Sequence, residues 1–160
     1  MCSRKHFVTL VAGVLALALP VAVALAAGSS SSTSTGGGAT PDAEYKMAQA
    51  SIAQADYPTA VTHLQNVLAS VANNADALNL VGFSERKMGK LDKSLEYYNK
   101  ALAIQPNHLG ANEYLGELYL DMKNAKKAEE RLPVLDKACG GTCSEYVELK
   151  DKIAKFKSQS

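Results

Sequence analysis

The residues best able to do chemistry in this sequence are two cysteines near its end. Cys139 and Cys143 stand in the stretch ACGGTC, separated by two glycines and a threonine. Such a pair can form a structural disulfide, act as a redox switch or contribute to a metal site. The spacing differs from the Cys-x-x-Cys of redox folds, and two cysteines without a nearby histidine make a poor zinc site. The pattern favours a structural disulfide, with thiol-disulfide or metal handling as the alternative.

The sequence shows no recognisable set of catalytic residues. His63 and His108 stand apart from any pattern with zinc-ligand spacing, and no local signature joins a nucleophile, a base and an orienting group. No glycine-rich phosphate loop follows a strand, and no segment reads as a convincing strand. We therefore expect a protein with no enzymatic activity, no cofactor and no metal site.

Residues 1–27 have the layout of a secretory signal peptide. A basic start precedes an uncharged apolar run from Phe7, and small residues follow at the region where cleavage would occur. The run over residues 7–27 is also about as long as a bilayer crossing requires, so a retained anchor is the alternative. Pro20 argues against a regular spanning helix. Residues 28–40 are rich in Gly, Ser and Thr, and we expect a disordered linker there.

Removal of the signal peptide would leave a nearly neutral chain. The whole sequence has 17 basic and 16 acidic residues, and loss of Arg4 and Lys5 leaves 15 against 16, a net charge of −1. Such a balance gives no bulk attraction to nucleic acid or anionic lipid. Export would place Cys139 and Cys143 in a compartment where disulfides form and persist. Cleavage would also remove Cys2, which leaves this pair with no odd thiol.

An internal repeat runs through the rest of the chain in units of equal length. Residues 41–74, 75–108 and 109–142 align beneath one another without insertion or deletion. Small residues recur in register at two positions of each unit, as expected where helices approach closely. These columns are Ala48, Gly82 and Gly116, and Ala60, Ser94 and Ala128.

Each unit is predicted to be two antiparallel helices joined by a tight turn. Apolar residues recur at three-and-four spacing, which is typical of helices with one buried face. In the middle unit Gly89 ends the first helix and Pro106 ends the second. Pro133 falls inside the second helix of the third unit, where we expect it to kink or split the helix.

Residues 143–160 are predicted to form a helix that caps the array. Their apolar residues make one stripe and most of the charged residues lie elsewhere, which suits the end of a repeat stack. Thr142 and Glu145 have capping-box spacing at the start of this helix, with Ser144 as the rival cap. A membrane-surface helix is the alternative, although the mixed charge favours a cap.

These units resemble the tetratricopeptide repeat family, whose unit of about 34 residues carries bulky and small residues in a fixed order. The resemblance covers residues 41–142 and implies an all-α fold. It implies a right-handed helical-repeat solenoid of three helix-turn-helix units, closed here by the C-terminal capping helix. The middle unit matches best, through Leu78, Val81-Gly82, Ser94, Tyr98, Ala101 and Pro106.

The resemblance also implies a concave groove that binds a protein or peptide, lined by the first helix of each unit. A Phe beside an Arg would suit an interface anchor. The alternative is that Phe83 packs on the neighbouring repeat while Arg86 and Lys87 pair with Glu117 or Asp121. By resemblance, the groove residues are Tyr45, Gln49, Ile52, Asn79, Phe83, Arg86, Lys87, Glu113, Glu117 and Asp121.

These patterns predict a non-catalytic interaction protein, an adaptor, scaffold or assembly factor of the bacterial cell envelope. We expect it to be exported, to the periplasm or on a membrane anchor facing it, and to bind a protein or peptide rather than nucleic acid. Tyr45, Asn79 and Glu113 do not match the residues with which some relatives hold a peptide's terminal carboxylate. Self-association through the poorly capped first unit is a further possibility for the array.

Overall fold

A computed structural model describes residues 39–159, which are helical throughout apart from short turns. The predicted signal peptide or anchor, and the linker as far as residue 38, lie outside the described residues. No helix within the described range is long and apolar enough to cross a membrane. In chain order the helices are α1 (Pro41–Ala53), α2 (Tyr57–Ser70), α3 (Ala75–Lys87), α4 (Leu91–Ile104), α5 (Leu109–Asp121), α6 (Ala125–Glu129), α7 (Leu132–Cys139) and α8 (Ser144–Ser158).

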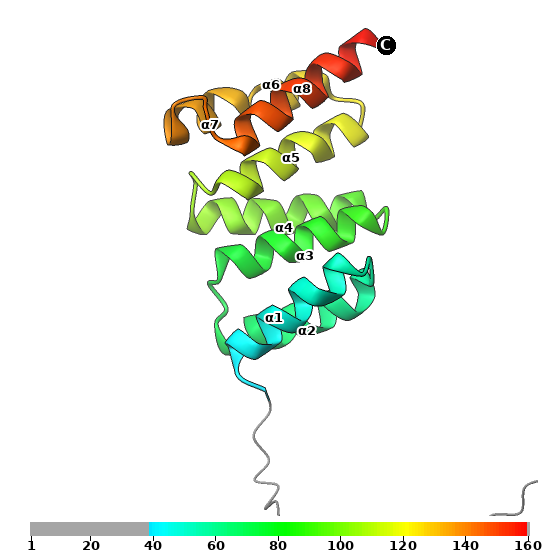
Figure 1. The fold of residues 1–160 in the computed structure, drawn as a ribbon, viewed down its shortest axis with the longest axis vertical. Helices are drawn as coiled ribbons and strands as arrows, with labels where there is room; N and C mark the ends of the chain where they lie inside the picture. The colour runs from blue at the N-terminus through cyan, green and yellow to red at the C-terminus, as the bar shows by residue number, and fades with distance from the viewer. Residues whose placement is uncertain (1–38, 160) are drawn as a thin grey trace, which may run out of the picture. The chain divides into compact units, whose positions relative to one another are not determined.

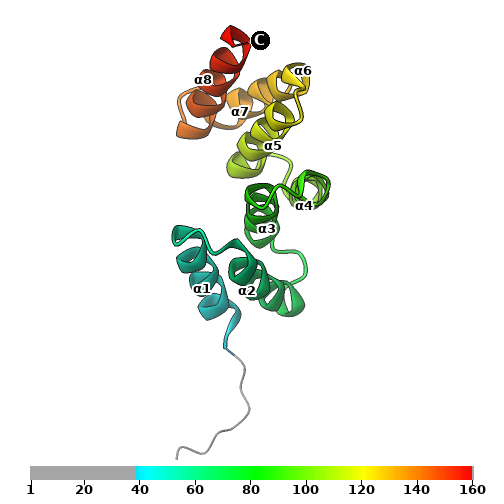
Figure 2. The same ribbon diagram turned by 90° about the vertical axis from the view of Figure 1, so that its right-hand side faces the viewer.

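The helices stack as successive antiparallel pairs, and the prediction of an all-helical repeat is confirmed. The first helices of the three units begin at Pro41, Ala75 and Leu109, which open the three aligned segments of the sequence. Each helix packs on the next, so α2 contacts α3 and α4 contacts α5 across the unit boundaries. Figure 1 shows the ladder of helices, and Figure 2 shows α1, α3, α5 and α8 along one side of it.

Close helix packing explains the columns of small residues. A Cβ atom on Gly82 would lie 2.7 Å from the Tyr98 ring, and one on Gly116 would lie 2.6 Å from the Leu149 side chain. The Ser94 hydroxyl donates a hydrogen bond to the Gly82 carbonyl over 2.8 Å, which ties α3 to α4. The small side chains therefore let a bulky residue of another helix fill the space above them.

The tight turns inside the units repeat one backbone conformation. Ala55, Gly89 and Lys123 occupy the same position of the three units, and their φ angles are 58°, 77° and 59°. This left-handed conformation costs L-residues about 1–2 kcal/mol but is readily adopted by glycine. Only the middle turn has the residue that suits it best.

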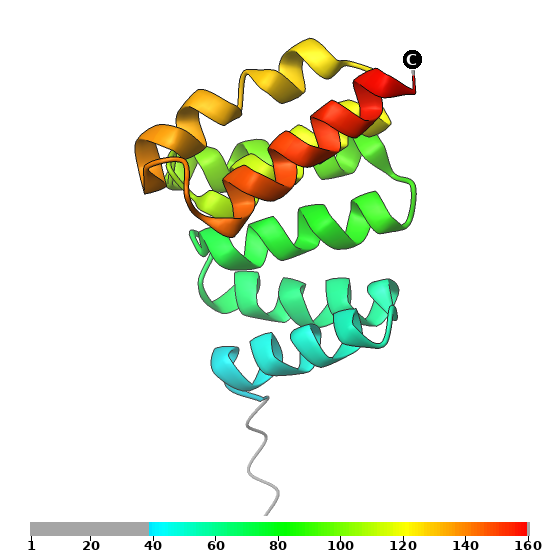
Figure 3. The same ribbon diagram turned by 45° about the horizontal axis from the view of Figure 1, so that its top comes forward.

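Pro133 splits the second helix of the third unit, as predicted. Helix α6 ends at Glu129 and α7 begins at Leu132, with Pro133 in the first turn of α7. Proline is tolerated at that position because the backbone N–H it lacks would have no partner there. The two short helices lie beside α8, which runs along α5 (Figure 3).

The predicted capping box of α8 is wrong. Cys143 occupies the N-cap position, and no side chain caps the helix. The Thr142 hydroxyl instead donates to the Cys139 carbonyl over 3.3 Å. Two left-handed glycines, Gly140 and Gly141, turn the chain so that the second cysteine is placed at the helix start. This turn places the start of α8 at the second cysteine of the bridge, and a side-chain cap does not form.

Candidate binding groove

The ten residues predicted to line a groove all lie on α1, α3 and α5, but they differ in how far they are exposed to solvent. Gln49, Lys87 and Asp121 are exposed, and Tyr45, Ile52 and Phe83 are partly buried. Buried positions, with 5–9% of the residue exposed, are Asn79, Arg86, Glu113 and Glu117. These four side chains are buried within the fold and do not form the free ligand-binding surface that the family resemblance had implied.

An ion network across α3, α5 and α8 accounts for most of this burial. Arg86 pairs with Glu117 and also donates through Nη1 to Asp121 Oδ2 over 3.0 Å. From α8, Lys152 pairs with Glu117, and its Nζ lies 3.4 Å from Glu113 Oε1. The capping helix therefore covers the part of the groove that α5 would provide.

The two buried carboxyl groups of the network, those of Glu113 and Glu117, have pKa values shifted in opposite directions. Burial raises the pKa of Glu113 to about 7, with Glu117 and Glu148 adding to the rise and Lys152 opposing it. Burial would also raise the pKa of Glu117, but the hydrogen bond from Lys152 and the charge of Arg86 outweigh it and hold this pKa below its usual value. Glu117 is therefore the permanent anion between two cations, whereas Glu113 can be protonated near neutral pH.

An aromatic cluster formed by residues of α2, α3 and α5 lies around Phe83. The Phe83 ring lies 6.2 Å from the Tyr57 ring and 5.1 Å from the Tyr114 ring, centroid to centroid. The Lys87 ammonium lies 5.2 Å from the centroid of Phe83. Since Phe83 is only partly buried, part of an aromatic and cationic surface is presented to a ligand.

The alternative interpretation of Phe83 and its neighbours is correct in part. Phe83 does pack on Tyr114 of the next repeat, and Arg86 does pair with both Glu117 and Asp121. Lys87, however, forms no ion pair with the described residues and lies over the aromatic ring instead. The candidate surface is thus reduced to Tyr45, Gln49, Ile52, Phe83 and Lys87.

Three residues of this region were not among the predicted groove positions. They are Tyr57 and Tyr114, which contact Phe83, and Lys152, which joins the ion network. Tyr57 begins a second helix, and Tyr114 stands beside a predicted groove position. Lys152 could have been found, because it stands three residues after Leu149 and four before Phe156 and so shares the buried face of α8.

The two cysteines are joined where α7 ends and α8 begins. The Cys139 and Cys143 sulfur atoms lie at bonding distance, with the Cα atoms 5.8 Å apart. Among the described residues no group of three or more His, Cys, Asp or Glu side chains could hold a metal ion. The bridge connects the last repeat to its cap.

Sequence comparison identifies the repeats. Models of the tetratricopeptide repeat match residues 42–74 and 75–108, which coincide with the first two helix pairs. The chain is a tetratricopeptide repeat protein. Proteins of this family generally act as protein–protein interaction modules and bind protein or peptide partners.

Two curated relatives share part of the sequence. Human protein O-mannosyl-transferase TMTC3 is 29% identical over 75 residues, which are 47% of this chain and 8% of the relative. The uncharacterized protein ycf37 of Pyropia yezoensis is 28% identical over 98 residues, which are 56% of this chain and 55% of the relative. The chain therefore spans a small part of one relative and about half of the other.

Solved structures share the tetratricopeptide repeat fold. The Sgt2 TPR domain from Aspergillus fumigatus has a TM-score of 0.66 at 22% identity, over 74% of this chain and 78% of that one. The TPR2B domain of yeast Sti1, solved in a complex with pHsp70, has a TM-score of 0.67 at 17% identity, over 75% and 98%. The translocator chaperone SycD of Yersinia enterocolitica has 0.65 at 13%, over 76% and 88%. At these identities the likeness concerns the fold alone.

Proposed function

We propose that this tetratricopeptide repeat protein is a non-catalytic adaptor or assembly factor of the bacterial cell envelope. The segment before the repeats has the layout of an export signal or anchor, which supports a site of action in the periplasm. The partner is a protein that presents an extended segment to the groove.

The binding surface in this proposal is the half of the groove formed by α1 and α3. The observation that carries it is the partly exposed Phe83 ring, supported by Tyr57 and Tyr114 and covered on one side by Lys87. Aromatic residues held rigidly next to a cation are typical of interface hot spots. Helix α8 and its ion network occupy the other half, so the ligand contacts Tyr45, Gln49 and Ile52 on α1 beside Phe83 and Lys87 on α3.

Affinity purification of the full chain from its native envelope, with Phe83→Ala beside the wild type, tests this surface. A matched control is Tyr97→Ala, because Tyr97 is also a partly buried aromatic residue with a lysine over its ring, at 5.1 Å, but lies on the second helix α4. We expect the partner identified by mass spectrometry to be lost with Phe83→Ala and kept with Tyr97→Ala. Equal recovery with both variants would contradict groove binding.

The location is tested separately by fractionating cells and measuring the mass of the protein. Release with the periplasmic fraction at a mass lacking about 27 residues indicates a cleaved signal. Full mass in the membrane fraction indicates the anchor. Full mass in the cytoplasm would contradict the envelope assignment without bearing on the groove.

A further inference from the structure

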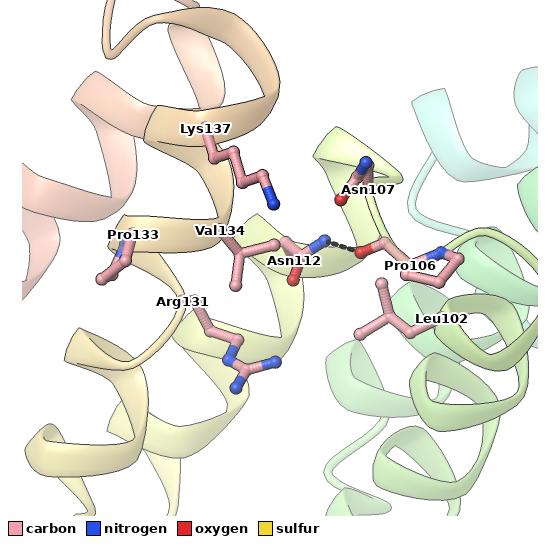
Figure 4. Close-up of a pocket in the computed structure, with 8 residues that line it drawn as sticks. All are labelled: Leu102, Pro106, Asn107, Asn112, Arg131, Pro133, Val134 and Lys137. Atoms are coloured by element: carbon pink, nitrogen blue, oxygen red, sulfur yellow. Dashed lines mark hydrogen bonds between the residues drawn. The ribbon is translucent and has the colours of Figure 1, made fainter.

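A pocket of about 440 Å³ lies away from the groove, between the α4–α5 turn and α7. None of the groove positions lines it. Its apolar residues are Leu102 and Pro106 on one side and Val134 on the other, and Asn112, Arg131 and Lys137 provide polar groups (Figure 4). Its volume lies in the usual range of small-molecule pockets.

The repeat provides an internal reference for this pocket. A smaller one, about 250 Å³, occurs at the same place between the first and second units. Its residues Ala72, Asn73, Leu78, Lys100 and Ala103 occupy the repeat positions that Pro106, Asn107, Asn112, Val134 and Lys137 occupy one unit later.

At three of the positions where the two pockets differ the larger one has the more polar side chain, whereas at a fourth Val134 replaces Lys100. Asn112 stands where the earlier unit has Leu78, and Lys137 stands where it has Ala103. Arg131 stands where the earlier unit has Tyr97. The later unit therefore brings one amide and two cations to the cavity, where the earlier unit has Leu78, Ala103 and Tyr97.

Asn112 is oriented by the fold and left with an unused acceptor. The residue is 1% exposed, and its Nδ2 donates to the Pro106 carbonyl over 2.9 Å and the His108 carbonyl over 3.0 Å. These two acceptors fix the amide, because the flipped orientation would set its oxygen against two carbonyl oxygens. Oδ1 is then buried with no donor, an arrangement that ordinarily costs about 1–3 kcal/mol. A ligand N–H would satisfy it.

Within the described part of the chain, the two cations of the pocket also lack an acidic partner. Neither Arg131 nor Lys137 forms an ion pair with any described residue, and no carboxylate lines the cavity. Arg131 Nε is buried without an acceptor. Figure 4 shows Lys137 and Arg131 extending from the α7 side on either side of Val134, facing the α4–α5 turn. An anion placed between them would have two charge-assisted donors.

We propose that this pocket binds the C-terminal residue of a peptide whose last side chain is aliphatic. The terminal carboxylate pairs with Arg131 and Lys137, and the N–H of the same residue donates to Asn112 Oδ1. The side chain contacts Leu102 and Val134. A C-terminal residue combines an anion, a nearby N–H donor and an apolar group, which are the three features that the cavity complements. This site is independent of the proposed groove.

The test is a titration of the ¹⁵N-labelled full chain with N-acetyl-glycyl-leucine, followed by NMR. We expect the side-chain amide of Asn112 and the backbone amides of the α4–α5 turn to shift, with a dissociation constant of about 1 mM. The C-terminal amide of the same compound should bind at least about tenfold more weakly. No shift at about 20 mM, or equal binding of acid and amide, overturns the proposal. Equal shifts with inorganic phosphate also overturn it, since they indicate a general anion site.

Two variants restore the residues of the earlier unit. Asn112→Leu should fill the cavity and abolish binding, and Lys137→Ala should weaken it about tenfold. Lys137 is exposed, so its replacement leaves the fold intact even if Asn112→Leu lowers stability. The control is Lys126→Ala, an exposed lysine on α6 that does not line the pocket. Unchanged affinity in Lys137→Ala, or the same loss in Lys126→Ala, overturns the assignment.

Discussion

Glu113→Gln is expected to stabilise the protein above neutral pH and to have no effect in acid. The carboxyl group is buried between α5 and α8, with 6% of its side chain exposed, beside Lys152, Glu117 and Glu148. Burial and the two neighbouring carboxylates raise its pKa to about 7, so the folded protein prefers the protonated group that glutamine imitates.

The sign and size follow from proton linkage. Between pH 4.5, the ordinary pKa, and about 7, the folded state holds a proton on Glu113 that the unfolded state has released. The free energy of unfolding therefore falls as pH rises through this window. A pKa difference of about 2.5 between the folded and unfolded states corresponds to about 3 kcal/mol, all of it lost above the folded pKa.

Urea unfolding followed by circular dichroism, at intervals from about pH 4 to pH 8, measures this difference between wild type and variant. Other titrating groups are common to the two proteins, so the difference isolates Glu113. The control is Glu148→Gln on α8, because Glu148 also faces Lys152 but its side chain is 57% exposed. That variant should differ from wild type by less than about 0.5 kcal/mol. A Glu113→Gln variant that is less stable than wild type at pH 8, or has the same pH slope, would refute the reasoning.

Two further predictions concern the turns and the bridge. Ala55→Gly should raise the free energy of unfolding by about 0.5–1 kcal/mol, because it removes left-handed strain at the cost of some chain entropy. Gly89→Ala should lower the free energy of unfolding by about 1 kcal/mol for the opposite reason. Thermal unfolding of both variants measures these changes, and a more stable Gly89→Ala variant would contradict the prediction. Replacing Cys139 and Cys143 together by serine should cost about 2 kcal/mol by loop-closure entropy, measured by urea unfolding with and without reductant. Equal stability of the oxidised and reduced wild-type protein would contradict a structural role for the disulfide and favour the thiol-disulfide alternative.

The sequence predicted the repeat well because its signals are local. The recurring columns of small residues reflect direct contacts such as Gly82 against Tyr98, and a single proline accounts for the split between α6 and α7. The start of α8 was mispredicted because Gly140 and Gly141 both adopt left-handed conformations, which places the helix start at Cys143. A capping-box spacing does not encode that turn.

The exposed part of the groove was harder to predict, because the position of a residue within its repeat does not show whether another helix covers that residue. Glu113 and Glu117 occupy positions at which the family contacts ligands, yet Lys152 of the next helix pairs with both. That contact joins residues 35 and 39 positions apart, from the last repeat to its cap, so no pattern within one unit reveals it.

The capping helix therefore determines which face of this array is free. In a repeat stack the helix after the last unit lies where the first helix of another unit would lie, so its side chains meet the groove positions of α5. In this protein Lys152 of α8 forms ion pairs with Glu113 and Glu117 of α5, and the cysteine bridge connects α7 to the start of α8. If Lys152 alone determines the closure, Lys152→Met should leave Glu113 and Glu117 without its positive charge and raise the affinity for cationic peptides, while Phe83-dependent binding stays unchanged. Unaltered peptide affinity would show that the apolar contacts of Leu149 suffice to keep that half of the groove closed.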